Sequence, residues 1–384
     1  MKLNSISHRI VALAVGLFLA GCGTVATPAP QNTFATTIPA TQETQAATVA
    51  ATVAITLAPT QAVTIAATEV STTAPTQAPT LTVTQAGTEA VMAATAAGTT
   101  ASVAQSSQTT FVLADVGSTP TQSIKTFQPL ADYLQAKLAP VGIKTVTIKV
   151  APDFDTIAKW LKDGEVDMLF QTPYPAILLE NAVGAKTILR RWRGAVPQYH
   201  TVIYARADSG VKTLDDLKGK VLAVQDKFST SAYMLPLSYI LSKGDKIMSL
   251  SDPSASVPSD TIGYAASNSD DNTIQWVISG KVTAGVSEQA TFDAIPDATR
   301  SQLVILGTTG DVPRGVVMVT PKMDPVLLDA LKSVLTSMDK SDDGLAVLKK
   351  TQNTAHIDEL PGGPDAALAE ARRLTKLLQD AVGN

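Results

Sequence analysis

From Phe111 onward the chain alternates short apolar runs with amphipathic stretches. The runs at 111–117, 144–151 and 166–171 predict strands, because each is short and bounded by turn residues. The stretches "FQPLADYLQAKLAP" and "DFDTIAKWLKDGE" carry apolar residues at helical spacing and predict helices between those strands. This alternation predicts an α/β fold with a mostly parallel sheet.

The second half of the chain repeats the pattern and suggests a second lobe. A long apolar run at 199–209 predicts a strand that crosses to that lobe, and the run at 314–321 predicts the return. We therefore expect one folded, two-lobed domain at 111–384. Its first lobe would comprise about 111–204 and 314–384, and its second lobe about 205–313. Two such lobes enclose a cleft, and ligands of α/β sheets bind at the carboxyl ends of strands.

The N-terminal part has a different composition. Residues 1–21 contain Lys2, Arg9 and an apolar run of signal-peptide length, which is too short to span a bilayer. The run ends in Leu-Ala-Gly before Cys22, resembling the lipobox of bacterial lipoproteins, so we expect lipidation at Cys22 and a membrane anchor by acyl chains. The alternative is a secretory signal with an incidental cysteine. Residues 22–110 are rich in Ala, Thr and Pro and predict a disordered tether, with short strands as the alternative.

Charge and composition restrict the function. The 384 residues carry a formal net charge of −4 and 17% charged side chains, which argues against nucleic acid as a partner. One cysteine and three histidines leave no intrachain disulfide and disfavour a Cys/His zinc site. The chain has neither a nucleophile elbow nor a phosphate-cradling "GxxxxGK" run, so we expect neither an enzyme nor a cofactor or metal.

The candidate site residues follow two predicted strands. Ser229, Thr230 and Ser231 come after "VLAVQ", at the start of a helix that contains Pro236. Hydroxyls at a helix start cap free N–H groups, and the same corner can hold an anion. Gln171, Thr172 and Tyr174 follow the strand "VDMLF", where the alternative is a simple strand-to-helix turn.

The segments "FQPLADYL", "APDFDTIAKWLKDGEVDMLF", "ADSGVKTLDDLKGKVLAVQDKFSTSAYMLP", "ISGKVTAGVSE" and "DVPRGVVMV" together resemble the substrate-binding lipoproteins of phosphate, phosphite and phosphonate ABC transporters. The resemblance covers about 111–351 and implies a type II periplasmic-binding-protein fold, with two lobes, two crossover segments and an interlobe cleft. It also implies a small anionic ligand and, as partners, an ABC permease with its ATPase. The alternative is a ligand-sensing receptor domain for a signalling partner.

The resemblance assigns ligand contacts residue by residue. The family's Ser-Thr-Ser helix start matches Ser229–Ser231, whereas Phe154 stands where the family often has tyrosine, and Gln171 stands where a tyrosine can follow the strand. Ser269 is the nearest match to a family histidine. The family has an acidic residue near the return segment, and this chain has Arg314 or Gly315 in its place. These departures favour a small oxyanion without an amine. Phosphate, phosphite, an alkylphosphonate and a different anion all stay open.

Several side chains have simpler interpretations as well. Phe154 could pack within a lobe, Ser269 could cap the following helix, and Glu288 could be a solvated carboxylate. The charge run "RRWR" at 190–193 is most simply a solvated surface, with permease docking or a cation–π contact as alternatives.

Overall fold

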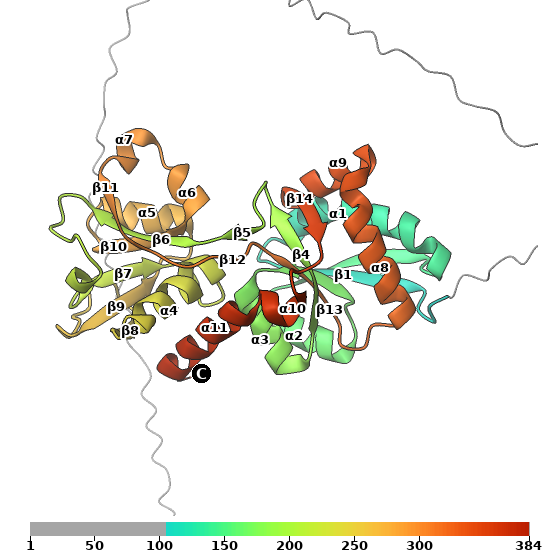
Figure 1. Cartoon of the computed structure of the whole chain (residues 1–384), viewed down its shortest axis with the longest axis horizontal. Helices are drawn as coiled ribbons and strands as arrows, with labels where there is room; N and C mark the ends of the chain where they lie inside the picture. Colours follow the sequence, from blue (N-terminus) through green and yellow to red (C-terminus); the bar gives the residue numbers. More distant parts are fainter. Residues whose placement is uncertain (1–104, 384) are drawn as a thin grey trace, which may run out of the picture. The chain divides into compact units, whose positions relative to one another are not determined.

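The computed structural model describes residues 105–383. The predicted signal peptide, the lipidation of Cys22 and nearly all of the predicted tether lie outside this range. The described strands form two six-stranded sheets and one two-stranded sheet, with helices interleaved between them (Figure 1). None of the described helices has the length and apolar character needed to cross a membrane.

The first sheet has the strand order β14-β4-β13-β3-β1-β2. Its strands are β1 (Thr110–Val116), β2 (Thr145–Ala151), β3 (Met168–Gln171), β4 (Lys186–Arg193), β13 (Val316–Val319) and β14 (Thr354–Asp358). β1 pairs parallel with β2 and β3, but β13 pairs antiparallel with β3 and β4, and β14 pairs antiparallel with β4. The prediction of a mostly parallel sheet is therefore wrong here. β13 belongs to the returning segment and enters the sheet in the opposite direction.

Helices cover both faces of the first sheet. They are α1 (Pro120–Leu138), η1 (Ala139–Val141), α2 (Phe154–Asp163), α3 (Pro173–Val183), α8 (Pro325–Ser337), η4 (Met338–Lys340) and α9 (Asp342–Lys350). Successive strand residues point to opposite faces, so Phe170 packs in the core with α1 and α8, whereas Leu169 packs with α2 and α3. Burial on both faces explains the continuous apolar runs of the sequence.

The second sheet has the order β11-β6-β10-β7-β9-β8. Its strands are β6 (Thr201–Arg206), β7 (Val221–Val224), β8 (Lys246–Leu250), β9 (Thr261–Ala266), β10 (Ala284–Glu288) and β11 (Leu303–Thr308). The accompanying helices are η2 (Asp215–Leu217), the π-helix η3 (Thr230–Met234), α4 (Leu235–Ser242), α5 (Asp270–Ile278), α6 (Gln289–Asp293) and α7 (Asp297–Arg300). Leu222 and Val224 pack in the core with α4, and Ala223 packs with Val277 of α5.

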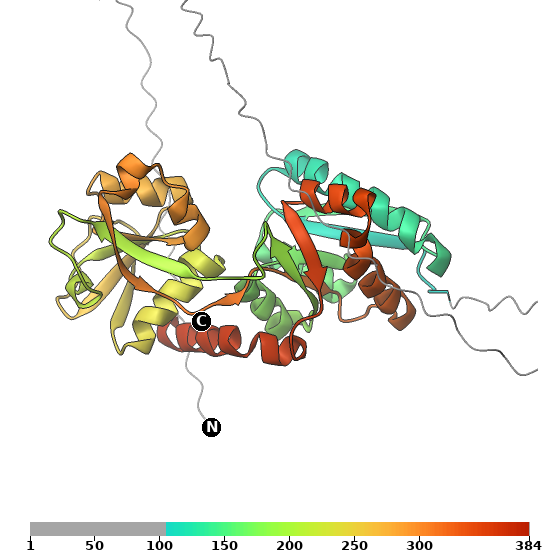
Figure 2. The same cartoon turned by 45° about the horizontal axis from the view of Figure 1, so that its top comes forward.

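Two segments connect the sheets. β5 (Gln198–Tyr199) and β12 (Val312–Pro313) pair antiparallel and run side by side between the sheets (Figures 1 and 2). The two expected crossover segments are thus present. The chain ends in α10 (Gly363–Ala367) and α11 (Ala369–Val382).

Helix α11 contacts helices that belong to both sheets. It packs against α3 and α4 (Figures 1 and 2). The Ser238 hydroxyl of α4 donates to the Leu374 carbonyl oxygen at 2.9 Å. The expected lobe boundaries stay a prediction. The expected assignment of α11 to the first lobe does not account for its packing against α4, which accompanies the second sheet.

Candidate functional site

The helix start after β7 carries free backbone donors. The Ser229 hydroxyl oxygen accepts the Ala232 N–H at 3.0 Å and caps the helix, as the capping interpretation predicted. The first turn is π-helical and changes to α-helix at Leu235, so Pro236 lies in the first turn of α4. Among residues 105–383, no acceptor takes the backbone N–H groups of Thr230 and Ser231. These donors and the positive end of the helix dipole suit an anion.

The Thr230 side chain connects the layer of elements built on the second sheet to the layer built on the first sheet. Its hydroxyl donates to the Thr172 hydroxyl oxygen at 2.8 Å and accepts the Tyr174 backbone N–H at 2.9 Å. Thr230 is 1% exposed, so both bonds lie away from solvent. The Thr230 hydroxyl is consequently occupied by protein groups, and only its backbone N–H is available to a ligand.

A cavity of about 580 Å³ opens beside this helix start. It is lined by Thr172, Arg193, Gly194, Ala195, Val196, Tyr199, Gln225, Ser229, Thr230, Ser231, Asp270, Glu288, Ala290, Thr291, Arg314 and Asn353. These residues come from both sheets and from the crossover segments, which places the cavity at the interlobe cleft. Its volume is in the range of small-molecule sites.

A buried ion pair forms part of the cavity wall. Arg314 Nη2 lies 2.7 Å from Glu288 Oε2, with side chains 8% and 18% exposed, and the Arg314 guanidinium lies 4.4 Å from the ring centre of Tyr199. Burial raises the pKa of Tyr199 to about 12, and the nearby Thr230 hydroxyl opposes this shift, but no group of the described chain makes a hydrogen bond of 3.5 Å or less to the Tyr199 hydroxyl. A buried hydroxyl without a partner beside a cavity is available to a ligand.

The cavity also contains one acid and one arginine outside that pair. Burial, and then the charge of Glu288, raise the pKa of Asp270, which therefore holds a proton more readily than an ordinary aspartate. The Arg193 side chain makes no ion pair or hydrogen bond with any residue in 105–383. Arg193 is thus an unpaired cation at the cavity wall.

A second cavity of about 430 Å³ shares Thr172 and Ser229 with the first. Phe154 and Gln171 line it, and the Phe154 ring stacks on Phe228 with centroids 4.8 Å apart and planes 10° apart. Phe154 begins α2 and Phe228 precedes the capped helix start, so this stack also bridges the two layers. Phe154 therefore packs between the layers, beside the site.

The structure brings together most of the predicted site residues, but not all of them. Ser229, Thr230, Ser231, Gln171, Thr172 and Phe154 line one or both cavities. The Tyr174 side chain is buried and lines neither cavity. Ser269 also lies outside both, and its hydroxyl oxygen accepts the Asn272 N–H at 3.1 Å as the cap of α5. The capping interpretation of Ser269 is confirmed, and the neighbouring Asp270 faces the cavity instead.

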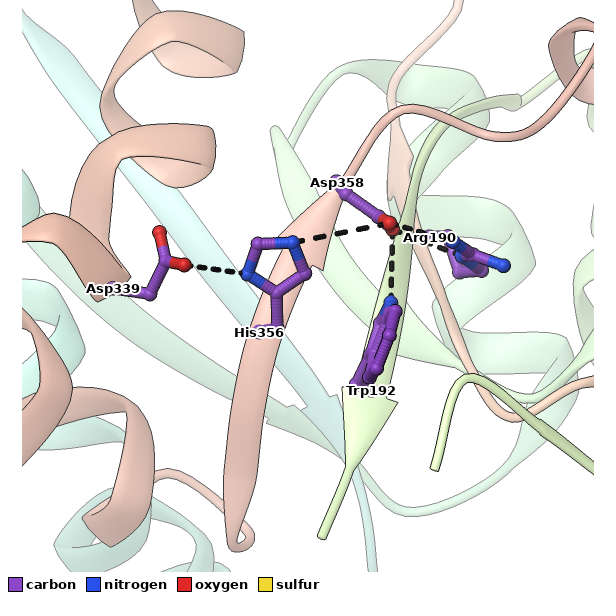
Figure 3. Close-up of polar contacts among 5 residues, drawn as sticks. All are labelled: Arg190, Trp192, Asp339, His356 and Asp358. Atoms are coloured by element: carbon purple, nitrogen blue, oxygen red, sulfur yellow. Dashed lines mark hydrogen bonds and ion pairs between the residues drawn. The ribbon is translucent and has the colours of Figure 1, made fainter. Parts of the chain in front are cut away.

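The run "RRWR" is divided between two environments. Arg190 donates to Asp358 with both Nε and Nη2, at 2.9 and 2.6 Å, and the Trp192 indole N–H donates to the same carboxylate at 3.1 Å (Figure 3). His356 completes this cluster beside Trp192 (Figure 3). Arg191 is 4% exposed, which makes the solvated-surface interpretation wrong for this residue.

Sequence reasoning missed several residues of the cavity wall. Arg193, Gln225, Asp270 and Asn353 were not predicted as site residues, and they lie beside predicted ones or at strand ends. Strand alternation in "RRWR" was the available signal for Arg193. Asn353 precedes β14, far along the chain, and no sequence signal points to it. Within the described residues, no group of three or more His, Cys, Asp or Glu side chains is placed to hold a metal ion.

Fold and site together define a class of protein: two-lobed binding proteins that hold a small ligand between α/β lobes. The family model described as "ABC transporter, phosphonate, periplasmic substrate-binding protein" matches residues 116–359, and the chain belongs to this family. The expected resemblance is thereby confirmed. The family consists of extracytoplasmic proteins that deliver a small ligand to a permease and its ATPase, and it is a transport family, not an enzyme class.

Solved structures agree with this assignment. XAC2383 from Xanthomonas citri is 27% identical, with coverage of 72% of this chain and 99% of that chain; its chloride-bound form has a TM-score of 0.67 and its ATP-bound form 0.66. PhnD1 from Prochlorococcus marinus, in complex with methylphosphonate, is 14% identical over 71% of this chain and 98% of that chain, with a TM-score of 0.54. The type II periplasmic-binding-protein fold is confirmed by these similarities.

Proposed function

We propose that this chain captures a small phosphorus oxyanion, such as phosphate, phosphite or a phosphonate, for an ABC importer. The observation that carries the proposal is the pair of free backbone N–H groups at Thr230 and Ser231, beside the unpaired Arg193. Backbone donors at a helix start and a guanidinium are the groups that bind phosphoryl oxygens in proteins. XAC2383 has been found with ATP, whose phosphates belong to the same chemical class.

Capture would occur by lobe closure. The Thr230 bonds to Thr172 and Tyr174 and the Phe154–Phe228 stack join the layers at the cleft, and they are the contacts that such a closed form would use. A ligand favours closure only by binding the closed form better than the open form. The same proposal includes lipidation at Cys22, with residues 22–110 as the tether to the membrane.

A substitution at Ser231 tests the position of the anion. The change Ser231→Asp places a carboxylate at the helix start. There it stabilises the helix by its interaction with the helix dipole, but it repels an anionic ligand. We expect isothermal titration to show a loss of phosphate and methylphosphonate affinity of about 100-fold or more. The matched control Ser231→Asn carries a neutral side chain of nearly the same shape as aspartate, and its affinity for both ligands should stay within a few fold of that of the parent protein.

The titration panel would contain phosphate, phosphite, methylphosphonate and 2-aminoethylphosphonate. If the parent protein gives neither binding heat nor a thermal shift with any of them, the phosphorus-oxyanion function is wrong. If Ser231→Asp binds as tightly as Ser231→Asn, the anion lies away from this helix start.

A further inference from the structure

Strand β4 places two arginines on one of its faces and a third on the other face. Arg191 and Arg193 are two residues apart and point to the same face of the strand, whereas Arg190 points to the other face and pairs with Asp358 (Figure 3). Arg314, which precedes β13, approaches the first pair from the returning segment, and its charge and that of Arg193 both act on Arg191. Arg193 and Arg314 therefore line the cavity, and Arg191 lies buried behind its wall, close enough for both charges to act on it.

Arg191 is a buried cation without a carboxylate partner. Its Nη1 donates to Gln352 Oε1 at 2.7 Å, its guanidinium lies 4.8 Å from the ring centre of Phe170, and its Nε has no hydrogen-bond partner among the described residues. Burial, followed by the charges of Arg193 and Arg314, lowers the pKa of Arg191 to about 9, while Asp115 opposes this shift. The guanidinium still carries its charge near neutral pH.

A strained turn holds this arrangement in place. Gln352 and Asn353 both have positive φ, 52° and 51°, which side chains other than glycine rarely adopt. Gln352 receives the Arg191 bond, while Asn353 lines the cavity and accepts the Gly194 N–H at 2.7 Å through its carbonyl oxygen. Strained backbone of this kind clusters at ligand sites.

The carboxylates nearby do not balance these charges one by one. Glu288 is engaged by Arg314, and Asp270, whose pKa is raised by burial and by the charge of Glu288, forms no ion pair with an arginine of the described chain. Asp115 forms no ion pair with Arg191 within 4 Å in the described structure. Asp270 and Asp115 act on Arg193 and Arg191 only from a distance, and neither arginine has a carboxylate within 4 Å in the described structure.

We propose that Arg193 contacts the ligand, that Arg191 is a positioning residue whose charge acts behind it, and that the two select a doubly charged anion over a singly charged one. This inference rests on the proposed phosphorus-oxyanion function and names the charge state of its ligand. A dianion supplies the two counter-charges that the cluster lacks, whereas a monoanion leaves one cation uncompensated.

The test compares two anions of the same shape. Methyl phosphate has a second pKa of about 6 and is mainly a dianion at about pH 7.5, whereas methyl sulfate is a monoanion. We expect the parent protein to bind methyl phosphate at least about 10-fold more tightly. Arg193→Gln should weaken methyl phosphate binding by about 10- to 100-fold and methyl sulfate binding by far less, so the preference disappears.

Variants at Arg191 and Arg190 separate charge from structure. Arg191→Gln should lower the preference by about 3- to 10-fold, and Arg191→Lys, which keeps the charge, should retain it within about threefold. Arg190→Gln is the matched control on the opposite face, and it should leave the preference unchanged even where it lowers the melting temperature. If Arg191→Gln does not fold, the preferences measured for Arg193→Gln and Arg191→Lys test the inference.

The outcomes separate this inference from the proposed function. If no phosphorus oxyanion binds the parent protein, both are wrong. If methyl phosphate binds no more tightly than methyl sulfate, or neither binds while inorganic phosphate does, the dianion inference alone is overturned. An unchanged preference in Arg193→Gln, or an equal loss of preference in Arg190→Gln, also overturns it.

Discussion

The buried hydroxyl of Thr230 should stabilise the contact between the two layers, and Thr230→Val tests this directly. Valine has nearly the same shape and leaves no cavity, but it removes the donor to Thr172 and the acceptor of the Tyr174 N–H. The Tyr174 N–H then stays buried without a partner, because the whole contact is away from solvent.

The magnitude follows from these two bonds. A buried donor left without a partner costs about 1–3 kcal/mol, and the lost hydroxyl bond adds about 0.5–1.5 kcal/mol. We therefore expect the free energy of unfolding to fall by about 2–4 kcal/mol. At roughly 2–4 °C per kcal/mol for a domain of this size class, the melting temperature should fall by about 4–16 °C.

Two measurements and one control complete the test. Thermal denaturation followed by circular dichroism gives the stability, and small-angle scattering without ligand reports whether the lobes separate. The control Thr230→Ser keeps both hydrogen bonds and loses only a methyl group, so it should retain most of the stability. A Thr230→Val protein that melts within about 1 °C of the parent would refute the role of the hydroxyl.

Three further changes test other parts of the structure. Burial raises the pKa of Asp358, but hydrogen bonds from Arg190 and Trp192 together lower it by more, so the net pKa in the folded protein is below the ordinary value. The carboxylate therefore stabilises the fold above the unfolded pKa of about 3.9, and this contribution is lost as the pH falls through the folded pKa. Asp358→Asn should lower the stability at neutral pH and make the stability less dependent on pH in acid denaturation. Gly285→Ala places a methyl group 2.8 Å from the methyl carbons of Thr273 and Val277 and should cost about 1–3 kcal/mol in urea denaturation. Tyr199→Phe removes a buried hydroxyl without a partner and should leave the melting temperature unchanged or raise it slightly, and a marked fall would contradict that reading.

Most of the fold could be predicted because its central strands, such as β3, β7 and β13, are buried on both faces. The apolar runs that end at Gln171 and before Gln225 become β3 and β7. The predicted strands at 199–209 and 314–321 become β6 and β13, and the paired crossing strands β5 and β12 come directly before them. Strand direction was not predictable from the same runs. A buried strand has the same composition whether its neighbours run with it or against it, so the antiparallel entry of β13 had no local signal.

The site was predictable only where a local rule and the ligand role coincide. Ser229 caps its helix, and the same helix start carries the free donors of the next two residues, so the sequence pattern led to the correct place. At α5 the same rule was misleading. Ser269 uses its hydroxyl as the cap, and the cavity is lined by Asp270, the first residue of that helix.

The arginines of β4 show why a charge run cannot be interpreted by composition alone. Four adjacent polar or aromatic side chains on a strand alternate between two faces, so one run can serve two environments at once. Here Arg190 stays with Asp358, while Arg191 is buried against Phe170. The hydrogen-bond partner of Arg191 is Gln352, which is 161 residues away in the sequence. Gln352 lies next to β4 because it directly precedes β14, which pairs with β4. The charge of this wall therefore depends on sheet topology, and the order of strands had to be known before the anion preference could be inferred.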